Sequence, residues 1–267
     1  MSGTGNPYAD TRHMYQVHAM FRREFALLPA LVRSVPAKDT ERAQAAAGHI
    51  RLVNRVLHHH HAGEDEVLWP LLLARAPRDI DPVVHLMEGH HRGIENILAE
   101  TEALLDTWSG NAAGQDGESL AEALEQLAVV LFEHMGLEEK LVLPLAERHI
   151  FATEWEKMVA DGAAAIPPDV GPVLAGMLMY EGGVDVLPSE MRAVLAELAP
   201  PAYAAHCERV HGTAAPPRST EVGIGTPYVG ITADADPALI AATAQVMRAY
   251  EHEVDAGREL RDLPTSR

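Results

Sequence analysis

The segment LHHHHAGEDEVLWP, residues 57–70, decides how this chain folds, because it recurs 74 residues later as LFEHMGLEEKLVLP, residues 131–144. Laid over each other, the two copies keep a leucine, a histidine, a glutamate, a second acid, an apolar run and a proline in register. An internal repeat with helical spacing indicates a duplicated helical unit whose two halves contribute the same kinds of side chain to one core.

Each copy places a histidine and a glutamate four residues apart, His60 with Glu64 and His134 with Glu138. Residues at this spacing lie on one face of a helix, one turn apart. Two such pairs on facing helices are the kind of side chains that form a two-metal site inside a helical bundle. Buried carboxylates without a partner would cost several kcal/mol or become protonated, and a cation between them removes that cost.

The composition limits the class of protein. The chain has 267 residues, 47% of them hydrophobic and 5% aromatic, with a formal net charge of −18. Few alternating β-branched runs occur, so helices are expected. The negative charge disfavours nucleic acid as a partner, and no window is apolar enough for a membrane span. A single cysteine, Cys207, and a start without signal-peptide character predict a cytoplasmic protein.

Apolar periodicity and helix punctuation predict four long helices, followed by a more irregular segment. The predicted helices span residues 11–35, 40–75, 81–108 and about 119 to just past 149, with a loop at 109–117 and local breaks at Pro70 and Pro144. Short connections favour an all-α antiparallel four-helix bundle over residues 11–150. A short helical extension is expected over 151–212, in segments 153–162, 170–180, 189–199 and 201–211. Residues 213–267 predict a Pro/Gly-rich loop or disorder with a terminal helix near 237–257.

Apolar flanks select among the fifteen histidines, because a metal ligand has to project into the core. At the offsets −7, −4, −3, +7 and +8 from His60 and from His134, every residue is valine or leucine, which places both histidines on the apolar stripe of their helices. His58, His59 and His61 have Asn54, Arg55 or another histidine one turn back, so we predict that they lie off the centre of the core. His60 and His134 are therefore the expected ligands of this repeat.

The first and third predicted helices carry a second repeat. His18 and His91 lie 73 residues apart, and each is followed by apolar residues at +3 and +7. His90 is a close rival of His91, but the repeat favours His91. Among the other histidines, His49 is expected to be a core or second-sphere residue. His13, His85, His149, His206, His211 and His252 lack matching partners and predict solvated or locally paired roles.

The ordered set of two lone histidines and two His-x-x-x-Glu pairs resembles the hemerythrin-like (HHE cation-binding) domain, over roughly residues 11–150. The resemblance implies a bundle that holds two non-haem iron ions, in preference to zinc or manganese. By it, the nitrogen ligands are His18, His60, His91 and His134, and the bridging carboxylates are Glu64 and either Glu138 or Glu139. That last choice stays open, because oxygen-carrying members place the second carboxylate five residues after its histidine.

One departure from the family concerns the third helix. Oxygen-carrying members have two histidines four residues apart there, whereas this chain has Met87 four residues before His91. Glu88 or Glu95 is a candidate to fill the gap; otherwise the site keeps an extra open position. Fewer histidines and more oxygen ligands favour ferric iron and redox chemistry over reversible oxygen carriage.

The resulting hypothesis is a di-iron protein that binds dioxygen, nitric oxide or peroxide, in gas sensing or in the response to oxidative or nitrosative stress. Enzymatic turnover is left open, since Tyr15, one turn before His18, is the only candidate proton donor. The alternative is a helical regulatory protein with a structural or vestigial metal, whose partner binds the C-terminal extension. The redox donor and any protein partner stay unknown.

Overall fold

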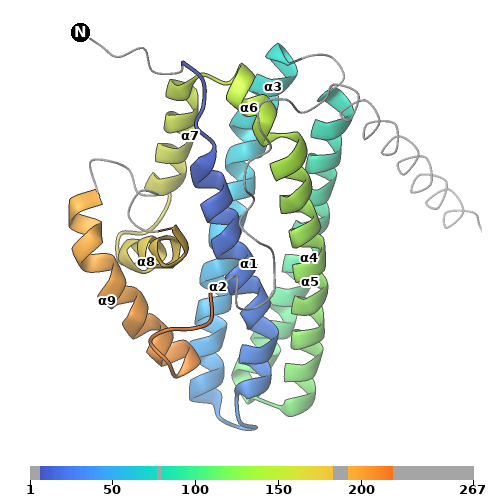
Figure 1. Cartoon of the computed structure of the whole chain (residues 1–267). Coiled ribbons are helices and arrows are strands. Elements are labelled where there is room, and N and C mark those ends of the chain that lie inside the picture. Colours follow the sequence, from blue (N-terminus) through green and yellow to red (C-terminus); the bar gives the residue numbers. More distant parts are fainter. Residues whose placement is uncertain (1–6, 77–79, 183–191, 219–267) are drawn as a thin grey trace, which may run out of the picture.

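Four long helices form the body of the molecule (Figure 1). The computed structural model describes residues 7–76, 80–182 and 192–218. The long helices are α1 (Arg12–Ser34), α2 (Thr40–Gly63), α4 (Asp81–Asn111) and α5 (Gly114–Leu141). Each packs against two others, α1 and α4 both lying between α2 and α5. The predicted all-α four-helix bundle is confirmed.

The core divides into two apolar clusters with a polar layer between them. The main core includes Phe21, Leu57, Ile94 and Leu131, one from each long helix. The end core, which also takes in α3, α6 and α7, includes Met14, Leu68, Met87 and Leu141. Followed from the N-terminus to the C-terminus, α1 and α4 run from the end core to the main core, whereas α2 and α5 run from the main core to the end core. Consecutive long helices are therefore antiparallel. Between the two clusters, each long helix or the turn that follows it contributes buried histidine or glutamate, namely His18, His61, Glu64, His91, His134 and Glu138.

Both predicted breaks occur close to their prolines. After α2 the chain forms a π-helical turn, η1 (Glu64–Leu68), before α3 (Trp69–Arg75), which has Pro70 in its first turn. After α5 the helix breaks at Val142 before α6 (Leu143–His149), which has Pro144 in its first turn. Proline has no N–H to donate, so each helix is interrupted where the regular hydrogen-bond ladder cannot continue. The π turn begins at a candidate metal ligand, a frequent position for such turns.

The predicted loop at 109–117 is wrong for most of its length. Helix α4 continues to Asn111 and α5 begins at Gly114, with Ala112 in the left-handed region at φ 47°. The Asn111 side chain accepts a hydrogen bond from the Ala113 N–H at 2.7 Å and closes the turn. Gly117 lies in the first turn of α5 and packs against Trp108; a Cβ there would lie 2.9 Å from the indole nitrogen. Here glycine permits close packing instead of breaking the helix.

Three further helices cover one side of the bundle (Figure 1). They are α7 (Ala152–Ala164), α8 (Gly171–Gly182) and α9 (Arg192–His211). Helix α8 packs on α1 and on α9, while α7 and α9 contact α2. The two helices predicted at 189–199 and 201–211 form one continuous helix, which runs through Pro200 and Pro201. Packing of the neighbouring Ala199 and Tyr203 against α8 offsets the hydrogen bonds that these prolines forgo. The predicted terminal helix lies outside the described residues.

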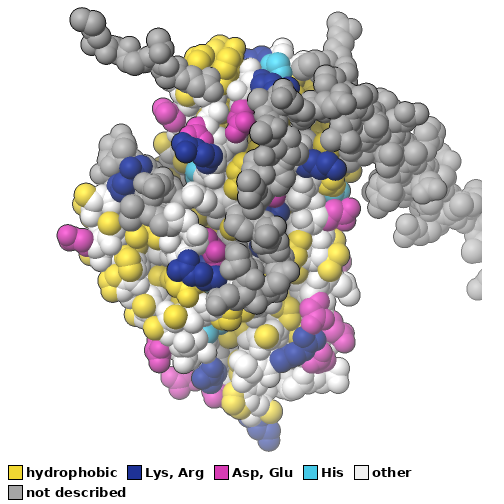
Figure 2. Space-filling model, in the orientation of Figure 1, with side chains coloured by type: hydrophobic (Ala, Val, Ile, Leu, Met, Phe, Trp, Pro, Cys, Tyr) yellow, Lys and Arg dark blue, Asp and Glu magenta, His cyan; other side chains and the backbone are white. Residues whose placement is uncertain are grey.

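The surface shows mixed charge and little histidine. On the face drawn in Figure 2, acidic and basic side chains are interspersed, and only small patches of histidine are visible. The buried histidines are His18, His49, His61, His91, His134 and His206 among the described residues. None of the described helices combines the length and the apolar character that crossing a membrane requires.

The contact between α8 and α9 depends on Gly176. A Cβ at this position would lie 2.6 Å from the Ala199 carbonyl oxygen and closer still to the Tyr203 Cβ. We expect Gly176→Ala to lower the free energy of unfolding by about 1–3 kcal/mol, because two backbones have to move apart. Gly48→Ala is the matched control, since nothing lies within 4 Å of its Cβ position in α2. It should stabilise the protein by about 0.5–1 kcal/mol. Equal effects in thermal unfolding would contradict this packing.

Candidate metal centre

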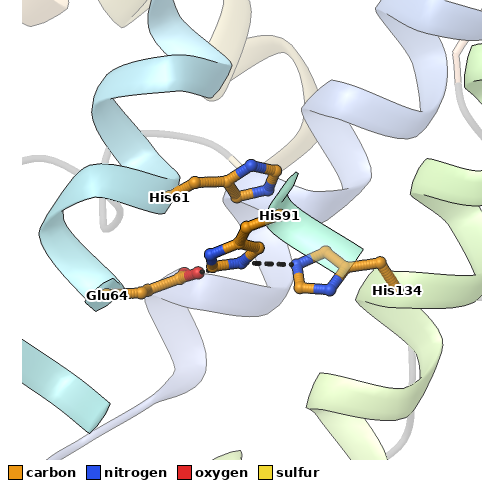
Figure 3. Close-up of side chains that lie close together, drawn as sticks. All are labelled: His61, Glu64, His91 and His134. Carbon is orange, nitrogen blue, oxygen red and sulfur yellow. Dashed lines mark hydrogen bonds and ion pairs between the residues drawn. The ribbon is translucent and has the colours of Figure 1, made fainter. Parts of the chain in front are cut away.

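Two groups of histidine and glutamate side chains lie side by side in the polar layer. In each, one ligand atom per residue lies within 4.8 Å of the others. The first group is His61, Glu64, His91 and His134, whose side chains converge from α2, η1, α4 and α5 (Figure 3). The second group is His18, His60, Glu64 and Glu138. Glu64 belongs to both groups, so the two candidate positions are adjacent.

Glu64 and Glu138 each face one histidine of the first group and one histidine of the second group. Glu64 places Oε1 at 3.1 Å from His60 Nε2 and Oε2 at 3.3 Å from His91 Nε2. Glu138 places Oε2 at 3.3 Å from His18 Nε2 and at 3.9 Å from His134 Nε2. A carboxylate between two sets of nitrogen donors has the arrangement of a bridging ligand.

These donor atoms are close together, yet few of them form hydrogen bonds. The buried atoms that lack a hydrogen-bond partner among the described residues include His18 Nε2, His60 Nε2, both ring nitrogens of His61, and all four carboxylate oxygens of Glu64 and Glu138. Buried polar atoms normally find partners, and several kcal/mol are at stake for each charged group left without one. Imidazole nitrogens and carboxylate oxygens are metal ligands, and here they are buried, close together and without hydrogen-bond partners. These residues therefore fit a metal ion.

The electrostatics of the layer agree with cation binding. Burial lowers the pKa of His60, His61 and His134 well below the ordinary value, so these imidazoles are neutral and keep a free lone pair. Burial, followed by the charge of Glu138, raises the pKa of Glu64 to about 7. Without metal, such a carboxylate is only partly ionised near neutral pH. A bound cation would favour its charged form.

His18 and His91 behave differently. Burial opposes their charged forms, but neighbouring carboxylates outweigh burial and raise the pKa of each to about 9. In the metal-free protein these two histidines are therefore protonated at neutral pH and compensate the glutamates. Metal binding at these nitrogens would have to displace those protons.

A second sphere repeats in the two halves. The Asp65 carboxylate lies 2.7 Å from His91 Nδ1 and accepts a hydrogen bond from the Trp69 indole at 2.8 Å. At the equivalent position of the other half, Glu139 lies 2.9 Å from His18 Nδ1. Arg22 donates to Glu139 at 2.6 Å. Each acid that follows a central glutamate thus orients the lone histidine of another helix and leaves its Nε2 directed into the layer.

The expectation that His61 lies off the core centre is wrong. It is 2% exposed, stacks on the ring of His91 at 4.1 Å between centroids, and belongs to the first group. His60 points to the other side, towards His18 and Phe21. A helix in a four-helix bundle has neighbours on two sides, so two consecutive residues can both be buried. The apolar-flank test failed because it judged His61 by the exposed His58 one turn back, whereas the burial of His61 comes from its contacts with His91 and His134 on other helices.

The other site residues fall as follows. His91 is buried in the first group, whereas its rival His90 is outside both groups. Glu138 belongs to the second group, and Glu139 instead binds His18 and Arg22. Met87 stands where oxygen-carrying members have a further histidine, and neither of the expected substitutes, Glu88 and Glu95, belongs to a group. Glu95 instead pairs with the exposed His58 at 2.8 Å. His61 supplies the additional histidine, so the expected shortage of nitrogen donors does not arise.

A four-helix bundle with buried histidine and glutamate groups able to hold metal defines a metal-binding helical protein. Residues 9–146 match the family model described as Hemerythrin HHE cation binding domain. The chain therefore belongs to the hemerythrin HHE cation-binding family. Searches of curated proteins and of solved structures gave no match. The boundaries predicted for the C-terminal segments stay predictions.

The different positions of Glu138 and Glu139 generate a prediction. Glu138→Ala removes a carboxylate that faces both groups and should abolish binding of at least one metal ion. Glu139→Ala removes the acid that pairs with His18 and Arg22 outside both groups, and should weaken metal affinity by about 10–100-fold with unchanged stoichiometry at saturation. Competition titration with a chelator measures both. Glu122→Ala, an exposed position on the same helix, is the control. If Glu139→Ala lost the metal and Glu138→Ala kept it, the assignment would be reversed.

Proposed function

We propose that this chain is a cytoplasmic non-haem di-iron protein that binds a diatomic ligand or peroxide, for gas sensing or for the response to oxidative or nitrosative stress. The observation that carries the proposal is Glu64, whose two oxygens face histidines of two adjacent groups. A single structural metal would not need a carboxylate shared in this way.

The donor set supports iron. Five histidines and two glutamates make up the two groups. Mixed imidazole and carboxylate donors suit non-haem iron, whereas a structural zinc site is closed by four ligands, usually with cysteine among them. Two iron ions bound here would supply redox chemistry and coordination positions open to a small ligand. The chain's own residues hold those positions in a layer from which the two apolar clusters exclude water.

The burial of the layer supports a very small ligand. The side chains of the two groups are 0–3% exposed, with the exception of His60 at 13%. The main core and the end core close the layer from both directions along the bundle. Dioxygen, nitric oxide and peroxide are small enough to reach such a site through side-chain fluctuations, and larger organic substrates are not.

On the described part of the chain, Tyr15 is the candidate proton donor beside the site. The hydroxyl of Tyr15 lies 3.5 Å from the backbone carbonyl oxygen of Glu139. Its direction towards backbone supports a positioning role for Tyr15. We therefore place ligand binding ahead of catalytic turnover in the proposal. The single cysteine, Cys207, is buried, and its pKa is raised to about 11 by burial, so it does not serve as a reactive thiol.

Metal analysis with optical spectroscopy tests the proposal. Protein purified aerobically from iron-replete cells should contain about two irons per chain, one for each group, and show the near-ultraviolet absorption of a bridged ferric pair. Reduction followed by nitric oxide or peroxide should change that spectrum. Zinc alone, or no metal, would refute the iron centre. Two irons without any response to these ligands would refute ligand binding and favour a structural metal.

His60 and His61 provide a sharper test, because they belong to different groups. We expect His60→Ala and His61→Ala each to lower the iron content to one per chain or less and to remove the bridged spectrum. The matched control is His58→Ala, whose side chain is 57% exposed and pairs with Glu95 outside both groups. It should keep both irons. Retention of the full spectrum by His61→Ala would exclude this histidine as a ligand.

A further inference from the structure

A third group of polar side chains lies where the C-terminal extension meets the bundle. Glu24 on α1, His49 on α2 and His211 at the end of α9 each offer a ligand atom within 4.8 Å of the others. The group is separate from the two groups of the polar layer, with which it shares no residue. The sequence predicted His49 to be a core or second-sphere residue, and it is buried. It predicted solvated or locally paired roles for His206 and His211, whereas the packing of α9 on α2 brings both rings against His49.

The two oxygens of Glu24 have different surroundings. Oε1 accepts hydrogen bonds from Arg23, at 2.5 and 3.1 Å, and from the Tyr203 hydroxyl at 3.1 Å. Oε2 has no hydrogen-bond partner among the described residues, although Glu24 is only 1% exposed. Arg23 is shared with Glu181, at 2.7 Å, and so compensates Glu24 only in part. One oxygen is thus held in place while the other faces the histidines.

Burial and the neighbouring side chains shift the pKa of Glu24 in opposite directions. Burial alone would raise the pKa of this carboxyl, but Arg23 and His49 hold it well below its ordinary value. Glu24 is consequently ionised at neutral pH. A buried carboxylate with one unsatisfied oxygen favours a cation beside it.

The two histidines direct unpartnered nitrogens to the same place. His49 Nε2 lies 3.2 Å from Glu24 Oε2 without hydrogen-bond geometry, and the His49 side chain is 1% exposed. His211 Nε2 is also buried and has no hydrogen-bond partner among the residues the structure describes. Burial lowers the pKa of His211 to about 4, so its ring is neutral and keeps a lone pair for a ligand. The rings of His49 and His211 meet edge to face, with centroids 5.4 Å apart.

A hydrogen-bond chain without metal accounts for only part of this group. Arg209 lies 3.1 Å from His206 Nδ1, and His206 Nε2 lies 3.0 Å from His49 Nδ1. These atoms allow Arg209 to donate to His206 and His206 to donate to His49, whereas His49 Nε2 and Glu24 Oε2 are outside hydrogen-bond geometry. The chain leaves His211 Nε2 buried and unsatisfied. A cation uses that nitrogen, and exposed Arg209 is free to turn to solvent when His206 accepts the Nδ1 proton of His49.

We propose that Glu24, His49 and His211 bind one divalent transition-metal ion, and we take zinc as the ion to test because two imidazoles and one carboxylate are a known set of zinc ligands. Water or another nearby group completes the coordination. His206 is a positioning residue, because it fixes the ring of His49 without itself belonging to the group. The ion links α1 and α2 to the end of α9 and so clamps the extension to the bundle.

Zinc binding to the full chain, with its iron pair already loaded, tests this site. Elemental analysis after removal of free zinc should find one zinc per chain in addition to iron. Zinc at a hundredfold excess over its Kd should raise the thermal midpoint by roughly 5–10 °C. The proposal is independent of the di-iron function, since the iron spectrum reports that centre separately.

Variants decide between the site and a hydrogen-bond chain. His211→Gln removes one of the three proposed ligands and should abolish zinc binding and the thermal shift. The iron spectrum should be unchanged, because His211 belongs to neither central group. The fold should be kept, because His211 lies at a helix end and outside the chain of hydrogen bonds. His206→Gln should weaken zinc affinity by about 10–100-fold and keep one zinc at saturation. His85→Gln is the control, as His85 is exposed and its Nδ1 lies 2.7 Å from the backbone carbonyl oxygen of Asp81 on its own helix. Circular dichroism confirms that each variant is folded.

Two results would overturn the proposal. One is a folded full chain that takes up no zinc, cobalt or additional iron beyond its pair. The other is a His211→Gln variant whose metal content and thermal shift equal those of the unmodified protein. A third iron per chain that His211→Gln removes would support the site with iron as its ion.

Discussion

The cost of burying Glu64 and Glu138 is the constraint on which the rest of this structure depends. Both side chains are at most 1% exposed and lie between two apolar clusters. Carboxylates in such a place have to be protonated, paired or bound to a cation. The surrounding histidines meet that requirement in both states, since His18 and His91 carry protons in the metal-free protein and offer nitrogen donors once those protons leave. The polar layer is therefore a site prepared for positive charge.

The two halves of the bundle orient their histidine ligands in the same way. Each half contributes a central glutamate followed by an acid that orients a lone histidine from another helix, Asp65 for His91 and Glu139 for His18. The second-sphere acids connect the helices in pairs, so the position of one ligand depends on a helix that it does not belong to. The halves are not equivalent in every respect: His61 has methionine, Met135, at its counterpart position, and this difference makes the first group richer in nitrogen.

The extension uses the same chemistry at a second place. Helices α8 and α9 pack on α1 and α2, and the contact buries Glu24 and His49 together with residues of α9. A buried polar contact of this kind is specific, because the extension can satisfy it in one register only. In our proposal a metal ion completes that contact. The bundle would then have two kinds of metal position, one inside the layer and one at the junction with the extension.

The sequence by itself determined the four-helix bundle, the family, and five of the seven residues that form the two central groups, and it narrowed a sixth to Glu138 or Glu139, because a repeat with helical spacing carries that information locally. Only the tertiary structure decided three matters. It placed His61 inside, because burial in a bundle depends on two neighbouring helices and not on the flanks of one. It separated Glu138 from Glu139 through the contacts of Arg22 and His18. It also brought Glu24, His49 and His211 together across 187 residues of chain, a contact that no local pattern encodes because it arises from packing between elements.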